Sequence, residues 1–211
     1  MHIELTEMLR CPEPHEENVL VMSTGEMRGR MVRSGILGCP VCHREYPIVK
    51  GVVHFSGGEG TPLRDKNTQS LPGVPSPPSS LPALAVDAQT LQALLDLSGP
   101  GGYVVLLGSA ARHAVGLAGL MGGIHFVGVN APPEVEELPV LSLLACDTMV
   151  PLRHAMARGV VVGPELGAWL AEAARILLRG RRLVVEREDA AAPPGVTRLA
   201  VGQGLFVGQR G

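Results

Sequence analysis

The sequence predicts an α/β protein in which a small, β-rich, metal-binding unit precedes a sheet covered by helices. Two observations lead to this prediction: three of the four cysteines lie within the first 42 residues, and buried apolar strands alternate with helical segments from residue 84 onward. Residues 57–83 are rich in Gly, Pro and Ser, so we expect a linker there, or a strap packed on the surface. The chain is thus divided into residues 1–56, 57–83 and 84–211.

The composition excludes several classes of protein. A chain of 211 residues with 45% hydrophobic residues can form a core. Its net charge of −2 gives no general attraction to nucleic acid or anionic membranes, and 3% aromatic residues are too few for a base-stacking surface. No stretch reaches the roughly 18 apolar residues of a membrane helix, and the start, MHIELTEMLRCP, does not resemble a secretory signal. We therefore expect a cytoplasmic protein whose cysteines are metal ligands or buried thiols.

Caps and apolar runs place the first elements of residues 84–211. Asp87 is expected to cap a helix over AQTLQALLDL, which Gly99 and Pro100 would end. The continuous apolar runs YVVLLG, IHFVGVN, LPVLSLLA and GVVVG predict four strands buried on both faces of a parallel sheet. Residues 109–121 predict a weak helix, because they contain two glycines. The connection between residues 130 and 139 is too short to contain a helix.

The remaining elements follow from helical spacing and from a glycine-containing turn. Residues 164–179 predict the clearest helix, with Pro164 in its first turn and Gly180 beyond its end. RRLVVE predicts a fifth strand, and VTRLAVGQGLFVG predicts a closing β-hairpin. The basic run RGRR at residues 179–182 is expected to be a solvated helix end, with a contact to RNA phosphates as the alternative.

The spacing of the cysteines predicts a metal site. Cys39 and Cys42 form a Cys-x-x-Cys turn, which is the usual half of a tetrahedral zinc site. Cys11 supplies a third thiolate, and His15 is the nearest candidate for the fourth ligand, with His43 as the alternative. Because protein side chains would fill all four positions, this Zn²⁺ would be structural. A segment this small needs a bound metal ion for stability, since it cannot bury a stable core by itself.

The segments LRCP and GILGCPVCHREYPIVKGVVHF resemble the bacterial relatives of the small zinc-ribbon methyltransferase-activator proteins. The resemblance covers residues 3–55. A CPxC knuckle, an aromatic-Pro-Ile segment, the glycine at Gly51 and a short apolar strand recur together in that family. The resemblance implies a zinc ribbon that binds a protein partner, either a methyltransferase or a ribonucleoprotein. His15 stands near the family's second ligand cysteine, which is a departure from its pattern.

Residues 84–211 resemble the class I S-adenosylmethionine-dependent methyltransferases, which implies a reduced, Rossmann-like sheet. VVLLGSAAR at residues 104–112 matches the family's first strand and glycine-rich loop, of which Gly108 remains. Asn130 stands where the family has an acid for the ribose hydroxyls, and Asp147 stands where an acid commonly meets the adenine amino group. The resemblance therefore implies Gly108, Asn130 and Asp147 as contacts for S-adenosylmethionine.

The same loop has lost groups that a cofactor site needs. Ala110 and Arg112 replace glycines that let the backbone approach a ligand, and Leu106 replaces a carboxylate. Asn130 offers a neutral hydrogen bond in place of a charge-assisted one, which contributes roughly 1.5–3 kcal/mol against about 1 kcal/mol for the neutral bond. Together these losses would weaken the affinity for the cofactor by several orders of magnitude.

Two functions are compatible with these residues. The first is a non-catalytic binding or adaptor protein, a pseudoenzyme with a structural zinc and an eroded cofactor site. The alternative is an active S-adenosylmethionine-dependent methyltransferase acting on rRNA, tRNA or another acceptor. No catalytic residue can be assigned, because His113 and His154 are isolated in the sequence. A zinc-ribbon nucleic-acid binder is disfavoured by the acidic balance of charge.

Overall fold

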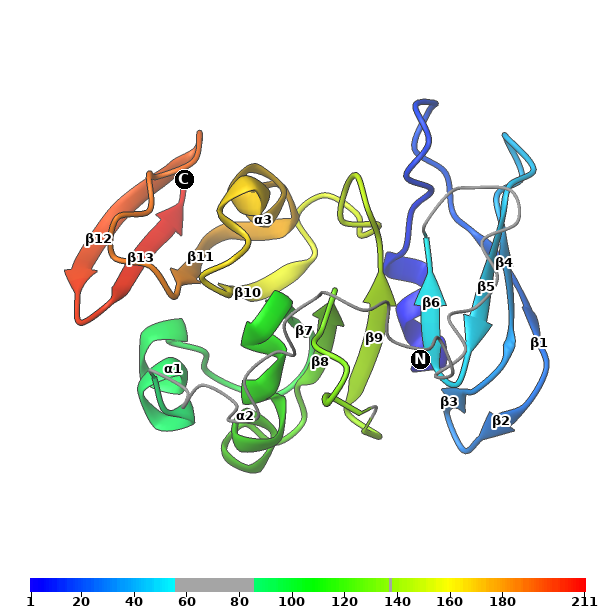
Figure 1. Ribbon diagram of the computed structural model, residues 1–211, viewed down its shortest axis with the longest axis horizontal. Coiled ribbons are helices and arrows are strands. Elements are labelled where there is room, and N and C mark those ends of the chain that lie inside the picture. The colour runs from blue at the N-terminus through cyan, green and yellow to red at the C-terminus, as the bar shows by residue number, and fades with distance from the viewer. Residues whose placement is uncertain (56–85, 137) are drawn as a thin grey trace, which may run out of the picture.

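The computed structural model describes residues 1–55, 86–136 and 138–211, so the expected linker over residues 57–83 lies outside the described residues. Within the described ranges, one mixed sheet runs through both ends of the molecule (Figure 1). Its strand order is β1-β4-β5-β6-β9-β8-β7-β10-β11-β13-β12. The described helices include none with the length and apolar character that crossing a membrane requires.

The centre of this sheet consists of five parallel strands: β7 (Tyr103–Leu107), β8 (His125–Val129), β9 (Leu141–Ala145), β10 (Ala157–Val162) and β11 (Leu177–Val185). β8 and β9 follow on one side of β7, and β10 and β11 follow on the other. The strand order thus reverses between β7 and β10, which is the topological switch point of an open α/β sheet. The antiparallel hairpin of β12 (Val196–Gly202) and β13 (Leu205–Arg210) completes the sheet. The predicted fold class, an α/β protein with a Rossmann-like sheet that ends in a β-hairpin, is confirmed.

Helices cover both faces of the sheet. α1 (Ala88–Leu95), the 3-10 helix η2 (Gly108–His113) and α2 (Ala114–Leu120) lie on one face, where Leu91 and Leu117 pack in one apolar cluster with Phe126. The 3-10 helix η3 (Gly167–Trp169) and α3 (Leu170–Ile176) lie on the other, where Ile176 packs in a second cluster with Val160. Among the described residues between β8 and β9 there is no helix, as predicted.

The first predicted helix is confirmed at its start and is wrong at its end. Asp87 caps α1 by accepting a hydrogen bond from the backbone N–H of Thr90 at 2.7 Å. α1 ends at Leu95, before the expected stop at residues 99–100, because Asp96 adopts a left-handed conformation with φ of 50°. Arg182 fixes this end, since its guanidinium donates to the Asp96 carboxylate and to the Leu94 carbonyl.

The predicted helix over residues 164–179 is wrong at both ends. α3 covers only Leu170–Ile176, and β11 begins directly at Leu177. Leu177 lies opposite Ala157 of β10 and is fully buried, so pairing with the sheet overrides the helical spacing of the sequence. The expected helix stop at Gly180 lies inside β11, at an irregularity in the register.

The N-terminal part extends the same sheet. β1 (Val21–Thr24), β4 (Gly35–Gly38), β5 (Glu45–Val49) and β6 (Val52–His54) are antiparallel neighbours, and the short strands β2 (Met27–Arg28) and β3 (Met31–Val32) form a separate hairpin. β6 then pairs in parallel with β9, with Val53 opposite Leu144. The 3-10 helix η1 (Ile3–Met8) contributes Leu5 to an apolar cluster that also contains Val53 and Val127. The core is therefore continuous between the N-terminal part and the parallel sheet.

Candidate metal centre and cofactor crevice

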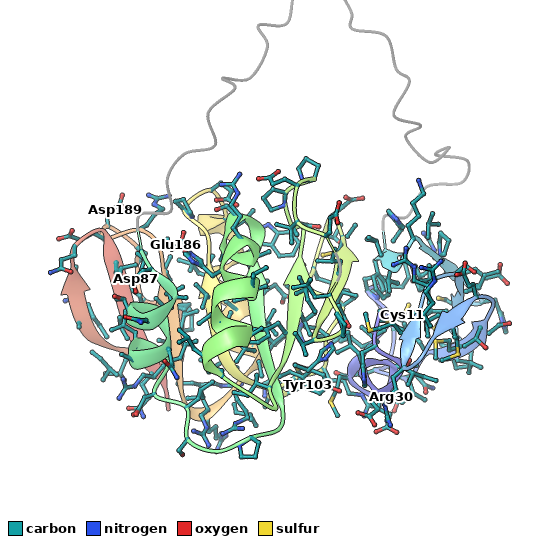
Figure 2. The ribbon with its side chains drawn as sticks, turned by 90° about the horizontal axis from the view of Figure 1, so that it is seen from below. Cys11, Arg30, Asp87, Tyr103, Glu186 and Asp189 are labelled. Carbon is teal, nitrogen blue, oxygen red and sulfur yellow. The ribbon has the colours of Figure 1, made fainter. Side chains whose placement is uncertain are left out.

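The four residues predicted as metal ligands come together in the N-terminal part. Cys11 follows η1 and is labelled in Figure 2, whereas Cys39 and Cys42 lie in the turn between β4 and β5. The ligand atoms of Cys11, His15, Cys39 and Cys42 all lie within 4.8 Å of one another. These four side chains can hold a metal ion.

The separations within this cluster match those of a tetrahedral site. Cys11 Sγ and Cys42 Sγ lie 3.7 Å apart, and Cys39 Sγ lies 3.3 Å from His15 Nε2. Ligand bonds of about 2.3 Å for sulfur and about 2.0 Å for nitrogen, set at a tetrahedral angle, give separations of roughly 3.8 Å and 3.5 Å. These two separations are within a few tenths of an ångström of the values for a tetrahedral site.

Hydrogen bonds around the cluster orient its ligands. His15 Nδ1 lies 2.7 Å from the carbonyl oxygen of Glu16, so Nδ1–H donates there and the lone pair of Nε2 points at the thiols. The hydroxyl of buried Tyr46 lies 3.0 Å from Cys11 Sγ. Sequence reasoning noted Tyr46 only as part of a motif and missed this contact, because nothing local signals a partner far away in the chain.

The thiols of the cluster differ in how easily they ionise. Burial raises the pKa of Cys11 to about 11. Burial also opposes ionisation of Cys39, but hydrogen bonds from the backbone N–H groups of Cys42 and Val41 outweigh it and lower the pKa of Cys39 to about 7. A metal ion binds the thiolate form, so the Cys-x-x-Cys turn favours the ligand state at Cys39.

The alternative ligand His43 lies outside the cluster. It is exposed and adopts a left-handed conformation with φ of 59°, at the end of the turn that carries Cys39 and Cys42. Its backbone N–H donates to the Cys39 carbonyl at 3.0 Å, which holds the turn closed. His43 therefore shapes the turn, and His15 supplies the imidazole of the cluster.

A carboxylate of the chain itself occupies the switch point between β7 and β10. Glu165, two residues after Gly163, accepts from the backbone N–H of Ser109 at 2.5 Å and from its hydroxyl at 2.7 Å. A Cβ atom added at Gly108 would lie 2.1 Å from Glu165 Oε1, and one added at Gly163 would lie 2.8 Å from Oε2. Both glycines make room for the Glu165 carboxylate, at the place where a ligand would approach the loop.

The side chain of Asn130 braces two strands through both of its polar atoms. Its Nδ2 donates to the Cys146 carbonyl at 2.8 Å, and its Oδ1 accepts from the Cys146 backbone N–H at 2.9 Å. This pair of hydrogen bonds ties the carboxyl ends of β8 and β9 together. Cys146 itself is a buried thiol, and burial raises its pKa to about 12.

The other two residues of the predicted cofactor site have different surroundings. Gly108 is buried directly after β7 and has a φ of 63°, so it keeps the conformation that favours glycine. Asp147 is exposed just beyond β9. Sequence reasoning missed Glu165 as an occupant of this region, since Pro164-Glu165 is also a typical start of a helix. An open pocket of about 370 Å³ lies elsewhere, lined by Thr6, Glu7, Val19, Leu20 and Arg153.

Comparisons with known proteins concern the fold. No protein-family model matches the chain, and no curated protein matches it. One similar structure is a complex between the Haloferax volcanii Trm112 methyltransferase activator and a putative methyltransferase, with 23% identity over 46% of this chain and 50% of that chain and a TM-score of 0.38. Another is geranyl diphosphate C-methyltransferase from Streptomyces coelicolor A3(2), with 16% identity over 46% of this chain and 41% of that chain and a TM-score of 0.39.

A third similar structure is an S-adenosylmethionine-dependent methyltransferase from Aquifex aeolicus, with 14% identity over 59% of this chain and 88% of that chain and a TM-score of 0.43. The match spans about half the length, or less, of the first two chains.

Proposed function

We propose that this protein is a non-catalytic binding protein built on a methyltransferase fold. The observation that carries the proposal is the carboxylate of Glu165 seated on the loop after β7, with both of its oxygens accepting hydrogen bonds from Ser109. A methyl donor entering at this loop would have to displace them. A hydrogen bond to a charged group contributes about 1.5–3 kcal/mol, so the displacement would weaken binding by roughly tenfold or more for each bond.

A second observation supports the same proposal at the neighbouring strand. Nδ2 and Oδ1 of Asn130 both bond the backbone of Cys146, which holds the amide against the end of β9, and a neutral amide offers a ribose hydroxyl no charge-assisted hydrogen bond. Cofactor contacts at Gly108, Asn130 and Asp147 therefore belong to the alternative function and not to the one proposed here.

Calorimetric titration with S-adenosylmethionine and with S-adenosylhomocysteine tests this proposal. The binding-protein proposal expects no binding at millimolar concentrations of either compound. A Kd below about 100 μM, which corresponds to a binding free energy of more than about 5 kcal/mol, would refute it. Methyltransferase activity would then become the working hypothesis.

The alternative, an active methyltransferase acting on rRNA, tRNA or another acceptor, is favoured by one feature of the same site. Glu165 is exposed, and a rotated side chain would present its carboxylate to the ammonium group of a methyl donor. The two functions therefore differ in what Glu165→Ala does. An enzyme whose donor is held by Glu165 loses measurable binding in this variant, whereas a protein whose loop is obstructed by Glu165 shows binding that is no weaker after the substitution.

We further propose that the ion held by Cys11, His15, Cys39 and Cys42 is zinc and that it is structural. Three thiolates and one imidazole in tetrahedral spacing suit Zn²⁺, and they leave no open position for water. When bound, the ion ties the segment after η1 to the turn between β4 and β5. A cytoplasmic location fits this ligand set, because the thiols stay reduced there.

Metal content and a matched pair of variants test this second proposal. The purified protein is expected to contain one zinc per chain, and the protein reconstituted with Co²⁺ should show the absorption of a tetrahedral thiolate site. His15→Ala should weaken metal binding, while His43→Ala should leave metal content unchanged, because His43 lies outside the cluster. Equal loss in both variants, or metal bound equally well without His15, would contradict the assignment.

The proposal includes a protein partner, as a methyltransferase-like fold without a donor site requires some other role. The N-terminal part already pairs through β6 with β9 of its own chain, so this edge of β9 is not open to another protein. A methyltransferase or a ribonucleoprotein component that binds this chain must therefore use a different surface.

A further inference from the structure

The open pocket of about 370 Å³ carries chemistry that neither the metal centre nor the switch point uses. Its lining comes from three separate parts of the chain. Thr6 and Glu7 belong to η1, the blue helical segment beside the N-terminus in Figure 1, Val19 and Leu20 directly precede β1, and Arg153 lies in the connection between β9 and β10. The volume is near the lower end of the range for small-molecule sites, so we consider a small ligand.

Backbone pairing and packing hold the walls of this pocket in place. The backbone N–H of Arg153 donates to the Met8 carbonyl at 2.9 Å. The adjacent residues Leu9 and Leu152 lie opposite one another in an antiparallel bridge, and both are fully buried. The Thr6 hydroxyl donates to a methionine sulfur of β1 at 3.6 Å, which connects η1 with the N-terminal strands. The polar groups of the pocket are therefore carried by a fixed backbone.

The guanidinium of Arg153 carries its positive charge without an acceptor from the described part of the chain. Two arginines nearby do have acidic partners. Arg10 pairs with Glu17 at 3.0 Å, and Arg175, which also donates to the carbonyl of the residue before Arg153, pairs with Glu172 at 2.8 Å. By contrast, the half-buried side chain of Arg153 makes no hydrogen bond or ion pair with any described residue, and its Nε is buried without a partner. A planar guanidinium in this state is suited to receive a carboxylate from a ligand.

A carboxylate lines the same pocket without neutralising Arg153. Glu7 is exposed, and its carboxylate makes no ion pair or hydrogen bond with any residue that the structure describes. Glu4, one turn earlier on η1, differs in this respect because it pairs with Arg30. The pocket thus presents one positive and one negative group that do not pair with one another. A ligand that carries both a carboxylate and an ammonium group satisfies both side chains, whereas a simple anion or cation satisfies one.

The remaining wall of the pocket is apolar. Leu20 is buried and belongs to the same apolar cluster as Leu5 and Leu9 of the N-terminal segment. Val19, beside it, is 44% exposed, so its side chain gains contacts if a ligand covers it. Covering apolar area in this way is favourable for an aliphatic group and unfavourable for a charged one. The third part of the ligand should therefore be aliphatic.

From these three features we propose that the pocket binds a free α-amino acid with an aliphatic side chain. The carboxylate of the amino acid accepts hydrogen bonds from the Arg153 guanidinium, its ammonium group donates to the Glu7 carboxylate, and its side chain covers Val19. Either end of a peptide carries only one of these two charges, so a peptide satisfies only one of the two charged side chains. The inference goes beyond the proposed function, since it requires neither a methyl-donor site nor a protein partner.

An NMR titration of the full chain with L-leucine tests the proposal, and two analogues of leucine serve as controls. N-acetyl-leucine lacks the ammonium group, and leucinamide lacks the carboxylate. L-Leucine is expected to bind with a Kd of about 1 mM or lower, and each analogue is expected to bind at least about tenfold more weakly. The backbone amide signals of Glu7, Leu20 and Arg153 should shift on binding. L-Aspartate should also bind at least about tenfold more weakly than leucine, because its second carboxylate would meet the apolar wall.

Matched variants locate the site. Arg153→Gln and Glu7→Gln should each weaken leucine binding by at least about tenfold. Arg198→Gln and Glu136→Gln remove the same charges at exposed positions on β12 and between β8 and β9, and they should leave binding within about twofold of the wild type. Val19→Trp should also weaken binding by at least about tenfold, because the indole ring would fill the pocket. Since Val19 lies at the surface, this variant keeps the test decisive if Arg153→Gln does not fold.

Several results would overturn the proposal. One is the absence of leucine binding at about 10 mM, and another is leucine binding that Val19→Trp leaves unchanged. Binding of N-acetyl-leucine as tight as that of leucine would assign the pocket to a simple carboxylate. S-adenosylhomocysteine also carries an α-amino acid group, and its titration separates the two proposals. Binding of this compound that Arg153→Gln leaves unchanged would refute the proposed function alone, whereas absence of leucine binding would refute the present inference alone.

Discussion

Lowering the pH from 7.5 to 4 should destabilise the protein through His125, which lies where the N-terminal part meets the parallel sheet. Ser142 Oγ accepts from the backbone N–H of His2 at 2.8 Å and lies 2.9 Å from His125 Nε2. A neutral His125 can accept the proton of the buried Ser142 hydroxyl at Nε2, whereas a protonated ring can only donate there. The ring of His2 lies 4.8 Å from that of His125, and Tyr103, labelled in Figure 2, contacts it by an edge.

The magnitude follows from the change in proton affinity. Burial, the neighbouring His2 and the Met1 amino group lower the pKa of His125 from 6.5 to about 4. The unfolded chain thus binds a proton at His125 below pH 6.5, which the folded chain takes up only near pH 4. The stability due to neutral His125 is present above pH 6.5 and is lost as the pH falls to 4. At about 1.4 kcal/mol per pKa unit, the loss is about 3 kcal/mol.

Urea unfolding of the wild-type protein and of His125→Gln measures the loss of stability that protonation of His125 causes. Glutamine can still accept the Ser142 hydrogen bond but does not titrate. The difference in unfolding free energy between the two proteins should therefore fall by about 3 kcal/mol between pH 7.5 and pH 4, while contributions of the metal cluster cancel in the difference. A difference that is flat across this range, or an NMR titration of His125 with its midpoint near 6.5, would refute the reasoning.

Three further substitutions test other contacts of the fold. Asp87→Ala should lower the melting temperature by about 2–4 °C, because α1 loses its cap, whereas Asp87→Asn should not. Glu186→Ala should cost about 1–3 kcal/mol in urea unfolding, since it leaves buried His113, 2.6 Å from the Glu186 carboxylate, without its hydrogen-bond partner; a cost below about 0.5 kcal/mol would contradict this. Asn130→Asp should cost about 1–3 kcal/mol, because a carboxylate oxygen would face the Cys146 carbonyl, and an unchanged stability would show that the brace is dispensable.

Elements with a strong local signal could be predicted from the sequence. The cap at Asp87 and the Cys-x-x-Cys turn at Cys39 and Cys42 depend on residues a few positions apart, and the structure places them as expected. The apolar runs of the central strands were equally clear, because strands buried on both faces need no polar alternation. Even the choice of His15 rested on spacing alone, and the geometry of the cluster agrees with it.

Features that depend on pairing between distant segments could not be predicted. Nothing near Val53 indicates that β6 lies beside Leu144 of β9, because that pairing is decided by the whole sheet. The same reason explains the error at Leu177, whose apolar neighbours fit a helix as well as a strand until β10 is present. The position of the Glu165 carboxylate could not be predicted either, since its hydrogen bonds join segments that are far apart in sequence.

The weakened cofactor site that we propose, and the absence of a helix among the described residues between β8 and β9, would have a common physical cause at Asn130. Without a helix to pack over their ends, the two strands are held at their carboxyl edge by the paired hydrogen bonds of Asn130 to Cys146. An acidic side chain at this position could accept from the Cys146 N–H, but its second oxygen would meet the Cys146 carbonyl instead of donating to it. The acid that a ribose contact needs is thus incompatible with the brace that the short connection needs. In the proposed binding protein, loss of the donor site would thus follow from the short connection between β8 and β9, without separate damage to the loop at Gly108.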